Sequence, residues 1–377
     1  MTIFNQSKPK ILMITSRADH GGGPRHITLL LENLRNQVEF YIAAPEEGYY
    51  SEIFKSLCTK TTTIPHRQFT VKSFFSLLAF TKKNKIEIIH SHGRGAGYFA
   101  RLLRIFLPNL KVVHTHHGFF YQRLTGLKRL LLINAERFMS RITDSIIFVS
   151  PSEMDMAKSV NLFFEKKSHL VPNGIPVVPW KEPKPSSTLK RLITVTRLEP
   201  EKGNAILIQV MKYLSTLRDD YVLSIVGDGP ELPLLKSLVE DLGVQNHIQF
   251  LGYRNDVQQL YAGSDVFVST SLGEAQGIAL VEAMMHGIPV VVSKVLGHLD
   301  MIESGHNGFM FDIESPQDAA KMIDKLLSDE TLWKKIRTIA YDLAVERFPV
   351  EKMGHRTEGI YRKLIMESSG ISGSGIS

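Results

Sequence analysis

The 377-residue sequence contains a single cysteine, Cys58. One thiol excludes an internal disulfide and any metal site made only of cysteines, and it favours a reducing compartment. The sequence also has no Asp-x-Asp, and its nearest equivalent, Glu153-Met154-Asp155, lies in a predicted helix. Magnesium held by paired aspartates is therefore not expected. We predict that the protein uses no metal and no other cofactor.

Long apolar runs are missing as well. The first ten residues are mostly polar, and the apolar run Ile11–Ile14 is too short for a signal peptide or a membrane span. We therefore expect a cytoplasmic protein. The length and the ordinary balance of 43% hydrophobic and 22% charged residues fit two globular domains.

Charge is divided unevenly along the chain. Residues 1–177 carry 24 Lys and Arg against 12 Asp and Glu, whereas the remaining residues carry 21 against 26. A basic half is suited to an anionic lipid surface, a phosphorylated acceptor or nucleic acid. A solvated basic surface without a partner explains the same pattern.

Short buried runs alternate with helical patterns throughout, which predicts an α/β protein with two doubly wound, Rossmann-like domains. The segment 176–187 (PVVPWKEPKPSS) is rich in Pro, Lys and Ser and reads as a linker. The predicted parts are an N-terminal domain at 1–178, a second domain at 188–349, a helix at 350–366 that packs back on the first domain, and a disordered tail at 367–377.

A glycine run follows the first predicted strand, 10–15. Gly21, Gly22 and Gly23 precede a helical pattern at 27–36, and Pro24 suits a first helical position. The run is not GxGxxG, so a Rossmann oxidoreductase is poorly supported. Glycines here permit close approach of the backbone to a ligand.

Four histidines lie at the ends of two predicted strands, where ligands bind in open parallel sheets. They are His90, His92, His116 and His117. A zinc site is conceivable, although no metal-binding helix motif is present. Polar residues lining a cleft are the favoured interpretation.

The stretch 264–293 organises the second domain. It reads as a strand at 266–269, a loop with Glu274, a helix opening near Gly277 and a strand at 288–292. Gly277, Ile278 and Ala279 would present unpaired first-turn amides, which form an anion site. Glu282 would lie about 7 Å behind them along the helix.

This arrangement suits a nucleotide sugar. Glu274 would bind sugar hydroxyls, the amides would bind the diphosphate, and Glu282 would bind the ribose diol. Alternatively, one glutamate caps the helix and the other is solvated. Arg197 and Lys202, after the first strand of the second domain, would oppose the diphosphate charge, unless they are surface charges beside Glu199 and Glu201.

Over nearly its whole length the chain resembles the family 4 glycosyltransferases, which have the GT-B fold with a deep cleft between two domains. The order and spacing of the motifs carry the resemblance. They are Gly22-Gly23, Thr115-His116-His117-Gly118, Pro172-Asn173-Gly174, Arg197 with Lys202-Gly203, Val226-Gly-Asp-Gly-Pro230, and Glu274-x7-Glu282 followed by Ala-Met-x-x-Gly-x-Pro-Val-Val.

The resemblance implies a retaining hexosyltransferase of bacterial surface-polysaccharide type. Its N-terminal domain would bind the acceptor, with Gly22, Gly23 and His92 near the substrates, and its C-terminal domain would bind the donor. Glu274 and His117 would act on the transferred sugar. The doubled histidine leaves His116 as an alternative to His117. The expected partners are a UDP-sugar and a saccharide or polyprenyl-linked acceptor, not nucleic acid.

Two positions depart from the family pattern. The loop after Glu274 reads Ala275-Gln276-Gly277, where relatives have Gly-Phe-Gly or Gly-x-Pro, and the usual Gly-Gly before the next helix is Gly297-His298. A nucleotide-sugar epimerase of the same fold and a non-catalytic nucleotide-sugar-binding regulator remain alternatives.

Membrane docking is a further expectation, on the inner face. It rests on an apolar stretch that contains arginines and on a basic helix. The residues concerned are Phe99, Leu102, Leu103, Ile105 and Phe106 among Arg101 and Arg104, and then Lys128, Arg129, Arg137 and Arg141. The alternative is that the apolar residues form the buried face of a helix.

Overall fold

The computed structural model describes residues 8–118, 125–162, 164–182 and 188–368. The chain divides into two compact units: unit 1 contains residues 1–174 and 350–377, and unit 2 contains residues 175–349. The division falls one residue before the predicted linker 176–187, so the linker belongs to unit 2. The last helix continues to Ser368, two residues into the predicted tail, and the rest of that tail lies outside the described residues.

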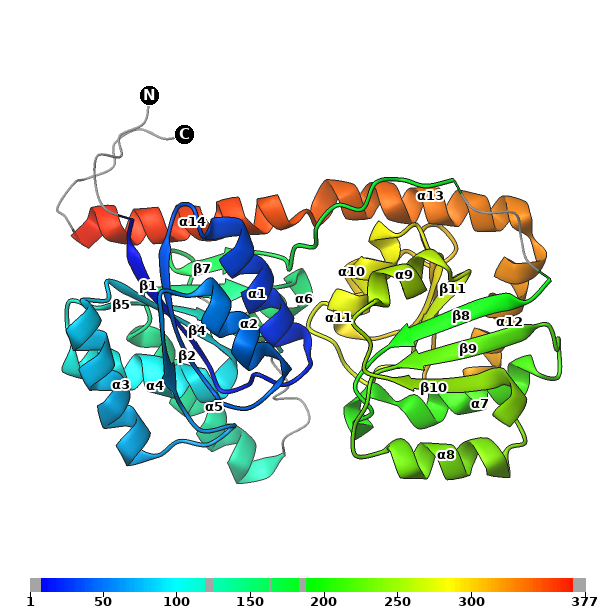
Figure 1. Ribbon diagram of the computed structural model, residues 1–377, viewed down its shortest axis with the longest axis horizontal. Helices are drawn as coiled ribbons and strands as arrows, with labels where there is room; N and C mark the ends of the chain where they lie inside the picture. The colour runs from blue at the N-terminus through cyan, green and yellow to red at the C-terminus, as the bar shows by residue number, and fades with distance from the viewer. Residues whose placement is uncertain (1–7, 119–124, 163, 183–187, 369–377) are drawn as a thin grey trace. The chain divides into compact units, whose positions relative to one another are not determined.

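Unit 1 is built on a seven-stranded parallel sheet of order β3-β2-β1-β4-β5-β6-β7 (Figure 1). Strand β1 contains the apolar run Ile11–Ile14, because both faces of a parallel sheet are covered. The strands are β1 (Lys10–Thr15), β2 (Glu39–Ala44), β3 (Lys60–Thr63), β4 (Ile88–His92), β5 (Lys111–Thr115), β6 (Ser145–Phe148) and β7 (Ser168–Leu170).

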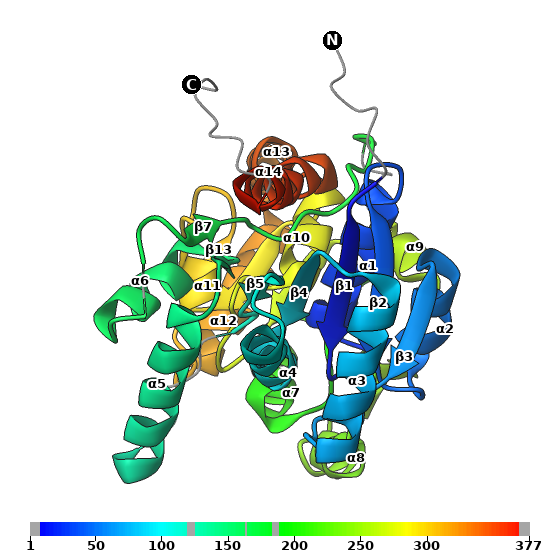
Figure 2. The same cartoon turned by 90° about the vertical axis from the view of Figure 1, so that its left-hand side faces the viewer.

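Helices cover this sheet. Leu12 and Ile14 of β1 share a core with α3 and α4, whereas α1 packs against α2 and α14. Figure 2 shows this unit from the side, with β1 between its neighbouring strands. The helices are α1 (Gly22–Leu34), α2 (Tyr49–Leu57), α3 (Val71–Asn84), α4 (Gly93–Phe106), α5 (Gly126–Arg141), α6 (Pro151–Ser159) and α14 (Val350–Ser368).

A buried histidine joins α14 to the sheet. Nδ1 of His90 lies 2.6 Å from the Tyr361 hydroxyl, and Nε2 lies 2.7 Å from Oγ1 of Thr115. Both bonds are buried, so they fix the imidazole between β5 and α14. His90 therefore supports the fold of unit 1, a role that its place beside His92 did not indicate.

Helix α1 begins earlier than predicted. It starts at Gly22 rather than at residue 27 and ends at Leu34, so Pro24 is its third residue and not its first. Glycine is a poor helix former. Packing of α1 against α2 and α14 outweighs this local preference, which is why the sequence pattern placed the start too late.

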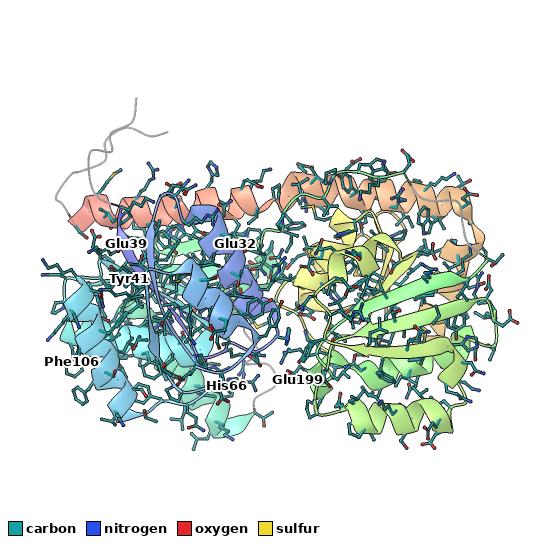
Figure 3. The ribbon with its side chains drawn as sticks, viewed as in Figure 1. Glu32, Glu39, Tyr41, His66, Phe106 and Glu199 are labelled. Carbon is teal, nitrogen blue, oxygen red and sulfur yellow. The ribbon has the colours of Figure 1, made fainter. Side chains whose placement is uncertain are left out.

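The structure also corrects the predicted membrane stretch on α4. Phe99, Arg101 and Leu103 are fully buried, and Arg101 donates a 2.6 Å bond to Glu136. Ile105 and Phe106 alone of the predicted apolar set are exposed, and Figure 3 shows Phe106 at the periphery of unit 1. Most of this stretch is thus the core face of a helix. Among the described residues, no helix combines the length and apolar character needed to cross a bilayer.

Unit 2 contains a six-stranded parallel sheet of order β10-β9-β8-β11-β12-β13. One hydrophobic core of this unit joins strand residues to α7, α8 and α12. The strands are β8 (Lys190–Val195), β9 (Tyr221–Val226), β10 (Ile248–Gly252), β11 (Val266–Ser269), β12 (Val290–Ser293) and β13 (Phe309–Phe311). The helices are α7 (Asn204–Leu214), α8 (Leu232–Asp241), α9 (Val257–Ala262), α10 (Ile278–Met285), α11 (Leu296–Leu299), α12 (Pro316–Ser328) and α13 (Glu330–Arg347), with 3₁₀ turns at Pro200–Lys202 and Gln245–His247.

The strand order reverses at one place in each sheet, between β1 and β4 in unit 1 and between β8 and β11 in unit 2. Ligands of open parallel sheets bind at the carboxyl ends of the strands at such a switch point. β1 leads to the glycine run and β4 ends at His92, whereas β8 leads to Arg197 and β11 to Glu274. The topology therefore places the predicted site residues at these two edges.

Candidate active site

Two loops meet at the switch point of unit 2, one after β8 and one after β11. The amide of Leu272 donates to the carbonyl of Glu201 at 2.9 Å, and the hydroxyl of Thr270 donates to the carbonyl of Gly203 at 2.9 Å. Gly203 has φ +61°, and a Cβ there would lie 2.3 Å from the Thr270 carbonyl oxygen. Only glycine fits this contact, which brings the two loops together.

Lys202 and Glu274 form an ion pair across these loops. Nζ of Lys202 lies 2.6 Å from Oε1 of Glu274, and each side chain is 17% exposed. The Ser271 hydroxyl donates to the same oxygen at 2.8 Å. Burial alone would raise the pKa of Glu274, but the charge of Lys202 and these two bonds hold it below its ordinary value. Glu274 is therefore a fixed carboxylate that accepts hydrogen bonds.

Arg197 is also paired with carboxylates. Its guanidinium contacts Glu199 and lies 3.4 Å from Glu201, and the Arg197 side chain is 18% exposed. Its backbone carbonyl accepts from Asn204 at 3.1 Å. The sequence offered two interpretations of Arg197, a diphosphate contact or a partner of the neighbouring glutamates. The pairing is the arrangement in this structure, and the diphosphate role stays a prediction.

The N-terminus of α10 lies beside Glu274 in the chain. Gly277 caps this helix with φ +90°, a left-handed conformation that favours glycine, and Ile278 is its first residue. The first-turn amides of a helix have no partner within the helix, so those around Ile278 and Ala279 form an anion site by their geometry. The predicted start of this helix is confirmed.

Glu282 lies inside α10 and is only 8% exposed. The Tyr261 hydroxyl lies 3.4 Å from one of its carboxylate oxygens. The alternative interpretation, a capping glutamate with a solvated partner, is wrong on both counts. The cap position is Gly277, with no side-chain cap bond, and Glu282 is buried.

In unit 1 the predicted histidines meet a third one that the sequence did not single out. Nδ1 of His92 lies 3.1 Å from Nε2 of His117, and the His26 ring lies 4.6 Å from the His117 ring, measured between centroids. His26 comes from α1, just after Gly22 and Gly23. His26 of α1 thus meets His92 and His117, which lie at the ends of β4 and β5, and only the folded structure shows this contact.

These imidazoles are electrically neutral near pH 7. Burial lowers the pKa of His26 to about 4 and holds the pKa values of His92 and His117 well below the ordinary range. One nitrogen from each of the three lies within 4.8 Å of the others. Neutral imidazoles can bind a metal. They can equally accept or donate bonds to substrate hydroxyls, so the geometry alone does not select a metal.

His117 and His116 differ in their surroundings. His117 has φ +58° and contacts His92, whereas His116 stacks on Phe148 in the interior. The contact with His92 groups His117, rather than His116, with the other predicted substrate residues. Its action on the transferred sugar stays a prediction.

A buried carboxyl group holds the backbone that follows His117. Glu153 accepts from the amides of Gly118 at 2.7 Å and Val149 at 2.8 Å, and burial raises its pKa to about 7 despite these bonds. Residues 119–124, which follow Gly118, lie outside the described residues. No sequence pattern indicated this role of Glu153, because its contact with Gly118 joins segments that are distant in the chain.

Comparisons with known proteins cover both units. The profile described as Glycosyltransferase Family 4 matches residues 20–178, and that of Glycosyl transferases group 1 matches residues 180–343. An Escherichia coli UDP-Gal:alpha-D-GlcNAc-diphosphoundecaprenol alpha-1,3-galactosyltransferase is 27% identical over 278 residues, which cover 70% of this chain and 72% of that protein. The E. coli O-antigen biosynthesis glycosyltransferase WbnH is 26% identical, covering 84% and 89% of the two chains.

Solved structures share the fold. Anabaena Alr3699/HepE, crystallised with UDP and glucose, superposes with a TM-score of 0.83 and 20% identity over 94% of this chain and all of that one. The agreement confirms the predicted GT-B fold of two Rossmann-like units. With a family profile matched to each unit and the motifs placed at both sheet edges, the chain belongs to the family 4 glycosyltransferases.

Proposed function

We propose that this glycosyltransferase moves a hexose from a UDP-sugar to a lipid-linked acceptor, with retention of anomeric configuration and without a metal ion. The observation that carries the donor half is the meeting of Lys202, Glu274 and the first turn of α10 at one switch point. Relatives whose names specify a UDP-sugar or UDP support the choice of nucleotide.

The donor sites follow from charge and burial. The α10 amides of Ile278 and Ala279 bind the diphosphate together with the cations of Arg197 and Lys202, which leave their glutamate partners in part to do so. Glu282, buried one turn further along the helix, accepts from the ribose diol. Glu274 accepts from hydroxyls of the transferred sugar.

The chemistry requires charge to be balanced as the nucleotide leaves. The bond between the anomeric carbon and the β-phosphate oxygen breaks, and the acceptor oxygen bonds to that carbon on the same face. The acceptor proton passes to the leaving phosphate, so no protein nucleophile is needed. Lys202, Arg197 and the helix amides stabilise the diphosphate charge that a metal would otherwise neutralise.

A surface on α5 supports a lipid-linked acceptor. Leu127, Leu130, Leu131 and Phe138 are each more than half exposed, and Lys128, Arg129 and Arg141 are exposed among them. The one acidic residue of α5, Glu136, is buried and paired with Arg101. Each basic residue near an anionic bilayer contributes about 1 kcal/mol, so α5 suits reversible docking on such a surface.

The donor assignment is tested with two matched variants, Glu274→Gln and Glu282→Gln. We expect Glu274→Gln to lower transfer from UDP-sugars at least about tenfold with nearly unchanged UDP affinity, because it loses a charge-assisted contact to the sugar. Glu282→Gln should weaken UDP binding itself in calorimetry. Equal UDP affinity in both variants and the wild type would refute this division of roles.

Two controls separate the alternatives. Incubation with EDTA should leave activity intact, and loss of activity that Mg²⁺ or Mn²⁺ restores would contradict the metal-free proposal. Isomerised sugar nucleotide formed without any acceptor would instead identify an epimerase.

The membrane surface is tested by sedimentation with phosphatidylglycerol and phosphatidylcholine vesicles. Binding should require the anionic lipid, weaken at high salt and fall in Leu131→Glu. The matched control is Leu234→Glu on α8, where the leucine is 63% exposed, compared with 60% for Leu131. Absence of binding to anionic vesicles at low salt would favour a soluble acceptor.

A further inference from the structure

His298 stands beside the proposed sugar site and has no role in the assignments above. It belongs to the short helix α11 and is only 1% exposed. Its Nδ1 lies 2.8 Å from the carbonyl oxygen of Ser293 at the end of β12.

The bond to Ser293 determines which nitrogen carries hydrogen. A carbonyl oxygen only accepts, so Nδ1 is the protonated nitrogen and Nε2 of the neutral ring is an acceptor. Burial lowers the pKa of His298 more than the nearby charge of Glu274 raises it, so the ring is neutral at pH 7. A neutral ring in this tautomer accepts a hydrogen bond at Nε2 but cannot donate one there.

The backbone holds this acceptor against the helix N-terminus. Nε2 of His298 lies 3.6 Å from the position that a Cβ on Gly277 would occupy. The amide of Gly297 donates to the carbonyl of Glu274 at 3.2 Å, and a Cβ on Gly297 would lie 2.7 Å from that oxygen. The residue before His298 is thus packed on Glu274, and the ring has little freedom to move.

We propose that His298 is a specificity-determining residue, whose Nε2 accepts a hydrogen bond from one hydroxyl of the transferred sugar. This inference rests on the proposed function. Phosphate oxygens are acceptors, so a neutral Nε2 offers them nothing, whereas a sugar hydroxyl can donate to it. Glu274 and His298 then form a pair of acceptors for the sugar, next to the amide donors of α10 for the diphosphate.

Two substitutions separate the two ends of the imidazole. His298→Asn places an N–H near the position of Nδ1, so it keeps the bond to Ser293 and deletes the Nε2 acceptor. His298→Gln places its amide oxygen near Nε2 and loses the bond to Ser293. The first variant removes the proposed sugar contact, and the second retains it.

The assay measures kcat/KM with UDP-glucose and UDP-galactose and with the monodeoxy analogues of whichever the wild type prefers. We expect His298→Asn to lower kcat/KM for the parent sugar about 3- to 10-fold, which is the size of one neutral hydrogen bond. For the one deoxy analogue that lacks the hydroxyl bound by Nε2, the kcat/KM of His298→Asn should equal that of the wild type. His298→Gln should recover part of the loss, and UDP affinity should be unchanged in both variants.

An equal loss in His298→Asn on every deoxy analogue would show a merely structural role and overturn the proposal. A His298→Asn variant with an unchanged rate and an unchanged preference between the two parent sugars would also overturn the proposal. If thermal unfolding shows that His298→Asn does not fold, the same analogue series is measured with His298→Ala, which also deletes the Nε2 acceptor. A wild type that binds no UDP would instead refute the proposed function.

Discussion

Acid should unfold unit 1 before unit 2, because a group of buried histidines is held neutral there. Burial lowers the pKa values of His26 and His116 to about 4, against 6.5 for an exposed histidine. Burial also holds His90, His92, His114 and His117 well below that value. The unfolded chain therefore binds protons that the folded unit excludes. The stability contributed by these neutral histidines is fully present above pH 6.5 and is lost progressively as the pH falls from 6.5 to and through the folded pKa values.

The magnitude follows from the two values that are defined. Lowering the pH from 7.5 to 5 costs about 2 kcal/mol for each of His26 and His116, or about 4 kcal/mol together. Glu153 acts in the opposite direction, because its raised pKa of about 7 makes the folded unit bind a proton more tightly than the unfolded chain. Over the same fall in pH it adds about 2 kcal/mol to the free energy of unfolding. The other four histidines act with the first two. A net loss of several kcal/mol is large against a typical stability of about 5–15 kcal/mol.

The chain offers a convenient assay. Its two tryptophans, Trp180 and Trp333, both belong to unit 2. Tryptophan fluorescence therefore reports unit 2, whereas circular dichroism at 222 nm reports the helices of both units. In urea titrations at pH 7.5, 6 and 5, an early transition should separate in the dichroism and move to lower urea, while the fluorescence transition moves less.

A variant measures the contribution of one histidine. His26→Gln removes one titrating group, so it should reduce the pH dependence of the early transition by about 1.2 kcal/mol per pH unit near pH 5.5. Coincident movement of both signals, or a transition that does not move with pH, would refute the argument that buried neutral histidines control the acid stability of unit 1.

Two further predictions concern single contacts. Arg101→Met should destabilise unit 1 by about 3–5 kcal/mol in urea titrations, because it leaves the buried Glu136 without its partner, whereas the double variant with Glu136→Leu should recover most of this loss. A double variant no more stable than Arg101→Met would contradict this. Gly297→Ala should lower transfer about tenfold, since its Cβ would lie 2.7 Å from the backbone oxygen of Glu274, whereas Gly359→Ala on α14, with open space around it, should be neutral. Wild-type activity in Gly297→Ala would show that the loop adapts freely.

Much of the fold was predictable because the signals that specify it are local. Apolar runs and helical periods predicted β1 and β11 with their observed bounds, and β12 and α14 within two residues. The end of β11, the loop with Glu274 and the start of α10 at Gly277 follow directly from such patterns. Strands β7 and β13 have three residues each, too few for a period to show, and they were missed.

Local sequence patterns were enough to identify the residues at the carboxyl edges of the two sheets, because strand ends and turns are specified over a few neighbouring positions. The contacts of those residues could be found only in the folded protein. Lys202 reaches Glu274 across 72 positions, and His26 meets His117 from another element. Arg101 and Arg104 look alike in the sequence, yet Arg101 is completely buried and Arg104 is not. Burial and charge pairing depend on elements distant in the chain, and local periodicity carries no information about them.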